Sequence, residues 1–317
     1  AGPIIRASNF LPQLREKITE VGTHYRLRII SIKNKNLKMG VTLMAFGFLK
    51  KMFFADNIAP LVDDIFVNPI GAESFTIILG AIAFGIQIYG DFSGYSDIAI
   101  GAALVLGLKI PINFNKPYFA NSPSDFWGRW HISLSSWLRD YFYIPLGGKR
   151  KSNERTYLNL MAVMFFGGLW HGASVNFIIW GMLHGAYLAI HKLILNRFPN
   201  LANNSFFRTK LGSFVAIFVT QYFVFLAWIS FRVDDIDHIV YSMQKYIILD
   251  FQFIETIEII NTHKISVIIL ILFILLHYVA YKKQEIKEKI SNLSYPYWIL
   301  FLVSVVLGIL LLYDGNP

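Results

Sequence analysis

Apolar runs recur along this chain, and polar or glycine-rich breaks separate them. A membrane helix needs roughly 20 mainly apolar residues to cross the hydrocarbon core of a bilayer. The runs that approach this description are Val41–Phe54, Phe75–Tyr89, Ile98–Leu108, Tyr157–Trp170, Val175–Ile194, Leu211–Phe231, Ile265–Tyr281 and Tyr297–Tyr313. We therefore predict an all-α, polytopic membrane helix bundle that forms one membrane-embedded domain over residues 1–317.

Several of these runs are short and rich in glycine, which favours short, tilted and re-entrant helices. One predicted break covers residues 90–97, and a second covers residues 171–174. Irregular backbone is tolerated at membrane depth where protein or a water-filled cavity covers it. Both breaks are therefore candidate linings of a polar cavity.

Composition supports lipid as the solvent of this chain. Of its 317 residues 55% are hydrophobic, 16% are aromatic and 15% are charged, whereas soluble domains carry nearer a quarter of charged residues. The net charge of +9 lies in short clusters between apolar runs, which is typical of membrane orientation and not of nucleic-acid binding. The absence of cysteine excludes disulfides, thiolate nucleophiles and Cys-ligated metal.

The loop charges predict an orientation, because short cytoplasmic loops are enriched in Lys and Arg. Basic residues cluster in 149–155, 192–210 and 282–296, and acidic residues cluster in 232–264. The three basic segments should face the cytoplasm and the acidic segment should face outward. The break at 171–174 is then expected at depth or toward the outer face.

His171 is the strongest candidate for chemistry, since it follows an apolar run and is flanked by Gly167, Gly168 and Gly172. Ionisable groups within apolar spans are expensive and often functional. A neutral imidazole takes a proton from a hydroxyl and later returns it, as a general base requires. The alternative is a histidine that hydrogen-bonds a carbonyl where two helices meet.

The segment from Asp125 to Tyr141 carries three Trp, two Arg, two Asp and one His, which is too polar for a membrane span. It predicts an interfacial or re-entrant helix. On that helix one face would carry Trp127, Trp130, His131 and Leu134. We interpret its tryptophans as an interfacial aromatic belt with snorkelling arginines. The alternative is a cavity lining in which an arginine binds phosphate or a carboxylate.

Asp91 and Asp97 place two carboxylates inside an apolar stretch. They can hold a cation, pair with Arg129 or Arg139, or bind a substrate, and a structural ion pair is the commonest of these outcomes. His184 and His191 lie seven residues apart, but a third ligand at usable spacing is missing, so we expect no metal site.

These motifs together resemble the membrane-bound O-acyltransferase (MBOAT) family, over nearly the whole chain. They are Gly90–Asp97, Pro111–Tyr118, Phe126–Ser135, Tyr143–Gly148 and Gly168–Ala173. The Pro145–Gly148 and Arg155–Asn159 stretches are similar to the alginate O-acetyltransferase branch. The resemblance also implies a fragment that lacks N-terminal spans and a short C-terminal tail.

The resemblance implies a helix bundle around a central tunnel, with His171 as the catalytic residue and His131 as a second, supporting histidine. Seven residues are expected to bind substrate or donor: Trp170, Arg129, Arg139, Asp140, Asp91, Tyr95 and Asn115. The implied donor is acetyl-CoA or another acyl thioester, with no bound cofactor.

The implied partners are a periplasmic acetyltransferase and an exported polysaccharide such as alginate, at the bacterial inner membrane. Two other hypotheses stay open. One is a non-enzymatic polar translocation channel lined by Asp91, Asp97, His131 and His171. The other is an O-acyltransferase that acts on a teichoic acid, peptidoglycan, a lipid or a protein.

Overall fold

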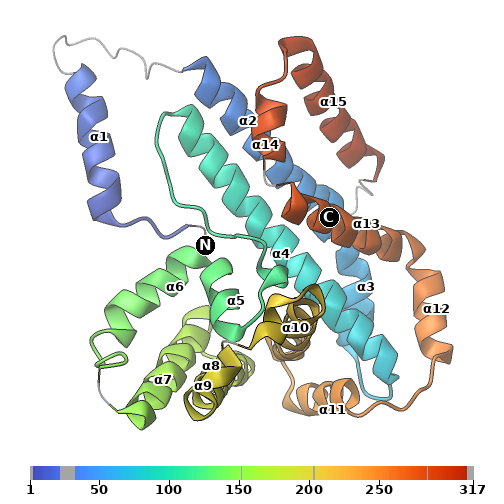
Figure 1. Cartoon of the computed structure of the whole chain (residues 1–317). Coiled ribbons are helices and arrows are strands. Elements are labelled where there is room, and N and C mark those ends of the chain that lie inside the picture. The colour runs from blue at the N-terminus through green and yellow to red at the C-terminus, as the bar shows by residue number, and fades with distance from the viewer. Residues whose placement is uncertain (1–2, 22–32, 151, 203, 284, 313–317) are drawn as a thin grey trace. The chain divides into compact units, whose positions relative to one another are not determined.

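The computed structural model describes residues 3–21, 33–150, 152–202, 204–283 and 285–312, and these form helices and connecting segments without a strand (Figure 1). The predicted all-α class is confirmed. Lys151 and Tyr313, which belong to a predicted basic cluster and a predicted span, lie outside the described residues.

The first half of the chain contains α1 (Ala7–Val21), α2 (Asn34–Phe48), the π-helix η1 (Leu49–Ala55), α3 (Asp56–Val67), α4 (Ser74–Val105), the 3₁₀ turn η2 (Pro117–Phe119), α5 (Pro123–Arg129), α6 (Ile132–Leu138) and the π-turn η3 (Arg139–Tyr143). The second half contains α7 (Asn153–His171), α8 (Val175–Arg197), α9 (Pro199–Ala202), the 3₁₀ turn η4 (Ser205–Arg208), α10 (Lys210–Arg232), α11 (Ile236–Ile247), α12 (Ile254–Thr262), α13 (Lys264–Lys282), α14 (Ile286–Ser291) and α15 (Tyr295–Leu311).

Four of the described helices are long and apolar enough to cross a membrane, namely α4, α8, α10 and α13. The predicted spans Val175–Ile194, Leu211–Phe231 and Ile265–Tyr281 fall within the last three of them. The fifth apolar helix, α15, has 17 residues and is shorter than a typical span. The polytopic membrane architecture is therefore supported by helices and not by composition alone.

The chain divides into two compact units, each with its own contacts. Unit 1 comprises Ala1–Ile58, Ile86–Phe114 and Ile268–Pro317, and unit 2 comprises Ala59–Gly85 and Asn115–Val267. Each unit is described separately below. The prediction of one domain over residues 1–317 stays a prediction.

In unit 1, glycines bring α2 and the second half of α4 into backbone contact. A Cβ atom on Gly47 would lie 2.6 Å from the carbonyl oxygen of Gly94, and one on Gly40 would lie 2.6 Å from that of Gly101. Because atoms do not approach so closely, only glycine fits at these positions. The small-residue seam lets two helices pack as they commonly do in membranes.

The predicted break at residues 90–97 is wrong, because α4 runs without interruption from Ser74 to Val105. Gly90 and Gly94 belong to the seam against α2 and η1, so their role is close packing and not chain reversal. The carboxylates of Asp91 and Asp97, which suggested a polar break, form ion pairs with lysines of unit 1. The predicted spans Phe75–Tyr89 and Ile98–Leu108 are thus parts of one long helix.

Asp97 accepts two charge-assisted hydrogen bonds, from the ammonium groups of Lys50 and Lys287, each at 2.7 Å. Lys50 lies in the π-helix η1 and Lys287 lies in α14. The carboxylate therefore joins three segments of unit 1 that are distant in the sequence. A largely buried ion pair of this kind fixes which partners can pack together.

Asp91 has a different lysine as its partner. The ammonium of Lys51 lies 2.6 Å from carboxylate oxygens of both Asp91 and Asp56. Of the outcomes left open for Asp91 and Asp97, the ion pair is the one observed, with lysines as partners. The π-helix makes this possible, since it presents adjacent lysines to carboxylates six residues apart on α4.

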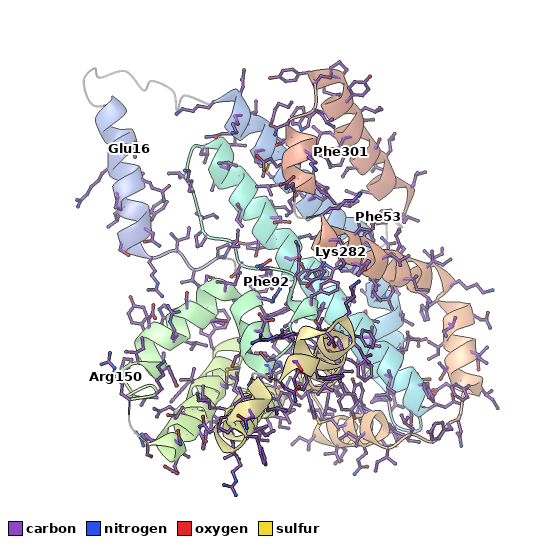
Figure 2. All side chains as sticks on the ribbon, in the orientation of Figure 1. Glu16, Phe53, Phe92, Arg150, Lys282 and Phe301 are labelled. Atoms are coloured by element: carbon purple, nitrogen blue, oxygen red, sulfur yellow. The ribbon has the colours of Figure 1, made fainter. Side chains whose placement is uncertain are left out.

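Unit 1 also contains a small apolar cluster in which η1 packs against α15. Ala45, Val305 and Ile309 are buried, and Phe53 and Phe301, which are labelled in Figure 2, pack against them. Nearby, the indole N–H of Trp298 donates a 2.9 Å hydrogen bond to the Thr42 hydroxyl. These contacts attach α15 to α2 and η1.

Replacing Asp97 with Asn should destabilise the protein, because the ammoniums of Lys50 and Lys287 would lose their shared carboxylate. Breaking a buried ion pair costs about 3 kcal/mol, which corresponds to a clear fall in the melting temperature in detergent. The matched control is Glu285→Gln, which removes an exposed 3.4 Å pair with Lys289 and should cost less than about 1 kcal/mol. Equal melting temperatures for the two variants would contradict the structural role of Asp97.

Candidate active site

His171 lies at a true helix break in unit 2, as the sequence predicted. Helix α7 ends at His171, Gly172 is extended with φ of 167°, and α8 begins at Val175. The imidazole is half-buried. The break therefore leaves the ring at the junction of two helices and not along the side of one.

The two helices at this junction touch through glycine backbone. A Cβ atom on Gly168 would lie 2.2 Å from the carbonyl oxygen of Phe177, and one on Gly181 would lie 2.3 Å from that of Met164. No side chain fits in either place. The contact fixes the start of α8 against the end of α7, and with it the surroundings of His171.

Aromatic rings enclose the imidazole of His171. The ring centroids of Trp180 and Phe231 lie 5.1 Å and 5.0 Å away, both nearly perpendicular to it, and Phe177 lies at 6.1 Å. Such edge-to-face contacts hold a ring in one orientation. Phe177 and Trp180 from α8 and Phe231 from α10 thus form an apolar wall against which the imidazole packs.

His131 is the second histidine of this site, and its backbone has an unusual conformation. It lies between α5 and α6 with φ of 42° and ψ of 53°, in the left-handed region that residues other than glycine rarely adopt. Its side chain is 2% exposed. Burial, together with the neighbouring His171, lowers the pKa of His131 to about 3, so its imidazole is neutral at physiological pH.

Trp170 connects the two histidines. Its ring lies 5.8 Å from that of His131 and 5.0 Å from that of His171, and it contacts both rings edge to face. The Trp170 side chain is 47% exposed, whereas His131 is buried. The predicted residues His131, Trp170 and His171 therefore form one cluster, which we call the histidine cluster.

Three predictions about the segment 125–141 are wrong. It forms two short helices and not one, because the left-handed conformation of His131 ends α5 and starts α6. Trp127 and Trp130 are buried and pack on His184 and Trp228, so they are interior residues of unit 2 and not an interfacial belt. The prediction that Trp127, Trp130 and His131 share one helix face is wrong because the helix is interrupted at His131, although all three side chains are buried.

The other predicted residues have local partners. Arg129 pairs with Asp125 at 2.7 Å, and Arg139 pairs with Asp140 at the same distance. The side chain of Asn115 is exposed, and its backbone N–H donates to the carbonyl of Arg129 at 2.9 Å. Asp91 and Tyr95 belong to unit 1, whereas the histidine cluster belongs to unit 2.

Sequence reasoning missed the aromatic wall and one buried amide. Asn176, in the first turn of α8, is fully buried and donates a 3.1 Å hydrogen bond to Asp234, just after α10. This bond joins the ends of the helices that supply Phe177 and Phe231. A buried Asn next to a polar break was the available signal, because amides in apolar segments need a specific partner.

The arrangement suits proton transfer beside an exposed aromatic ring. Two imidazoles flank Trp170, one buried and neutral and the other half-buried at a helix end. A neutral imidazole accepts a proton from a hydroxyl and then returns it to a leaving group. Across the described ranges there is no group of three or more His, Asp or Glu side chains placed to hold a metal ion.

Comparison with known proteins relates this chain to membrane-bound acyltransferases. Residues 1–231 match the model of the membrane-bound O-acyltransferase family, MBOAT. The probable alginate O-acetylase AlgI of Pseudomonas aeruginosa is 40% identical over 239 residues, which are 74% of this chain and 41% of that protein. The peptidoglycan O-acetyltransferase of Helicobacter pylori is 38% identical over 237 residues, 75% of this chain and 42% of that protein.

A more distant relative is the teichoic acid D-alanyltransferase of Bacillus subtilis, which is 28% identical over 217 residues, 64% of this chain and 52% of that protein. The chain thus spans less than half the length of the alginate and peptidoglycan relatives it matches.

Gly168→Ala and Gly167→Ala form a matched pair of variants in adjacent residues. Alanine at 168 would collide with the Phe177 carbonyl and force α8 away from α7, at a cost of about 1–3 kcal/mol. Alanine at 167 meets Leu138 at an ordinary 3.5 Å and should be neutral or stabilising by up to about 1 kcal/mol. Melting temperatures in detergent test this, and a loss at 167 as large as that at 168 would refute the close helix contact.

Proposed function

Because this chain belongs to the membrane-bound O-acyltransferase family, we propose that it moves an acetyl group from a cytoplasmic thioester across the membrane for O-acetylation of an exported polysaccharide. The observation that supports this most is the histidine cluster, in which His131 and His171 flank Trp170 at a helix break. Acyl transfer to a hydroxyl needs a base at the oxygen and a proton donor at the sulfur. One imidazole supplies both in succession.

His171 is the proposed general base. Its imidazole takes the proton of the acceptor hydroxyl as the oxygen attacks the thioester carbonyl carbon. The tetrahedral intermediate then collapses, the carbon–sulfur bond breaks, and the imidazolium returns its proton to the departing thiolate. The surrounding rings of Trp180 and Phe231 hold the imidazole in one orientation and exclude water, which would otherwise hydrolyse the thioester.

His131 is the proposed supporting histidine. Its neutral, buried imidazole supplies a hydrogen bond near the reacting atoms without adding charge. The proposed donor is acetyl-CoA, which acts as a substrate and not as a bound cofactor. Arg129 and Arg139, with Asp140 as the carboxylate that orients the latter, are candidates for the donor phosphates, because guanidinium groups bind phosphate at two points.

The proposed acceptor is a hydroxyl of an exported polysaccharide, reached through a periplasmic acetyltransferase partner at the bacterial inner membrane. The alginate and peptidoglycan relatives are almost equally similar to this chain, at 40% and 38% identity. Peptidoglycan is therefore the second candidate acceptor, and both polymers present sugar hydroxyls. The teichoic acid relative is less similar, at 28% identity.

Replacing His171 with Ala should lower acetyl transfer by about 10²–10⁴-fold, because the general base is lost. The measurement is incorporation of labelled acetyl groups into polymer by cells with equal amounts of the variant in the membrane. His238→Ala is the control, since that histidine lies in α11, outside the histidine cluster, and should leave activity unchanged. Full activity of the His171 variant would remove it from the mechanism.

A second experiment distinguishes an acyltransferase from a translocation channel. It measures the release of free CoA from labelled acetyl-CoA by the purified, full-length protein. An acyltransferase supplied with an acceptor hydroxyl cleaves the thioester, and a channel leaves it intact. We expect cleavage that depends on His171 and not on His238. An intact donor in the presence of acceptor would favour the channel hypothesis.

A further inference from the structure

A short turn connects α11 and α12. Its charged side chain faces the protein and its apolar side chains are exposed, which is the reverse of a loop that faces water. It lies between α10 and α13, two candidate membrane spans. Residues 247–254 read Ile-Ile-Leu-Asp-Phe-Gln-Phe-Ile, with one charged residue among eight. We call this segment the apolar turn.

The charged residue of the apolar turn faces the protein. Asp250 accepts hydrogen bonds from the ammonium of Lys245 at 2.8 Å and from the backbone N–H of Ser74 at 3.3 Å. In return, the N–H of Asp250 donates to the Ser74 hydroxyl at 3.1 Å. The Lys245 ammonium and backbone N–H groups lower the pKa of Asp250 to about 2, so the carboxylate stays ionised.

A second set of bonds follows at the start of α12. Glu73 accepts hydrogen bonds from the backbone N–H groups of Glu255 and Thr256, both at 3.1 Å, and the carboxylate of Glu255 accepts from the N–H of Glu73 at 2.6 Å. Each carboxylate therefore caps the helix of the other. The apolar turn is therefore bonded through Ile248 and Asp250 to Ser74, the first residue of α4. The two residues that follow the turn are bonded to Glu73.

The apolar side chains face outward. Ile248, Phe251 and Ile254 are 70%, 69% and 84% exposed, and Ile247, Leu249 and Phe253 are exposed as well. Phe251 adopts a left-handed φ of 55°, which bulky residues rarely take. The hydrogen bonds of Asp250 thus hold the turn in a shape that leaves Ile248, Phe251 and Ile254 largely exposed, whereas the ring of Phe253 stacks on Phe75 at 4.4 Å.

The position of the turn favours lipid as its surroundings. Ser74 begins α4, which is long and apolar enough to cross a membrane, so the residues bonded to Ser74 lie beside one end of a candidate span. Exposed aliphatic residues continue in α12 at Ile257 and Ile260, next to the exposed carboxylate of Glu258. Within the apolar turn itself, every exposed residue except Gln252 is aliphatic or phenylalanine. Such side chains suit the boundary of headgroups and acyl chains.

We propose that the apolar turn is a membrane anchor, which inserts Ile248, Phe251 and Ile254 into the lipid leaflet where α4 begins. The ion pair and caps on its inner side hold the anchor to α4. The anchor therefore sets the depth of the α4 entry point. This role is independent of acyl transfer.

The absence of cysteine allows a direct test by site-specific spin labels on single cysteines. Phe251→Cys and Ile254→Cys are labelled in the full-length protein in liposomes of phosphatidylethanolamine and phosphatidylglycerol. Collision with oxygen, which concentrates in lipid, is compared with collision with a water-soluble nickel complex. Ile268→Cys on α13 serves as the lipid-exposed reference and Lys289→Cys on α14 as the water-exposed reference.

We expect the labels at 251 and 254 to match the label at 268, with oxygen collisions at least several-fold more frequent than nickel collisions. A match to the label at 289 would overturn the anchor. Low collision with both reagents would also overturn it, because protein and not lipid would then cover the turn. Melting temperatures equal to that of the parent protein confirm that the labelled variants are folded.

Discussion

A bilayer offers no hydrogen bonds, so each polar group of a spanning helix needs a partner within the protein. This constraint explains why Asp97 and Asp91 in α4 each pair with lysines from the same π-helix. It also explains the glycine seams, because backbones in close contact leave no lipid-exposed gap between them. The same requirement at the helix ends produces the mutual caps of Glu73 and Glu255.

Long apolar runs and the break at His171 were predictable from the sequence, since each depends on residues close together in the chain. The continuity of α4 was not. Gly90, Asp91, Gly94 and Asp97 have the composition of a loop. Their partners in α2, η1 and α14 lie 40 to 47 or 190 residues away. Composition describes a segment alone, whereas its conformation here depends on distant neighbours.

Much of the histidine cluster was also predictable, because motif resemblance identified His131, Trp170 and His171. The left-handed backbone of His131 and the aromatic wall of Phe177, Trp180 and Phe231 were not. Helical periodicity assumes a regular backbone, so it fails where one left-handed residue interrupts the helix. The roles of the arginines and of Asn115 remain predictions, for which local ion pairs and exposure are the structural facts.

The bond between Glu73 and Glu255 joins residues 182 positions apart. During synthesis, the first turn of α4 therefore emerges from the ribosome long before the carboxylate that caps it exists. The intervening chain contains two further candidate spans, α8 and α10, which must enter the bilayer before α4 can be closed at this end. The start of α4 therefore has no cap from Glu255 until α8 and α10 have both been synthesised.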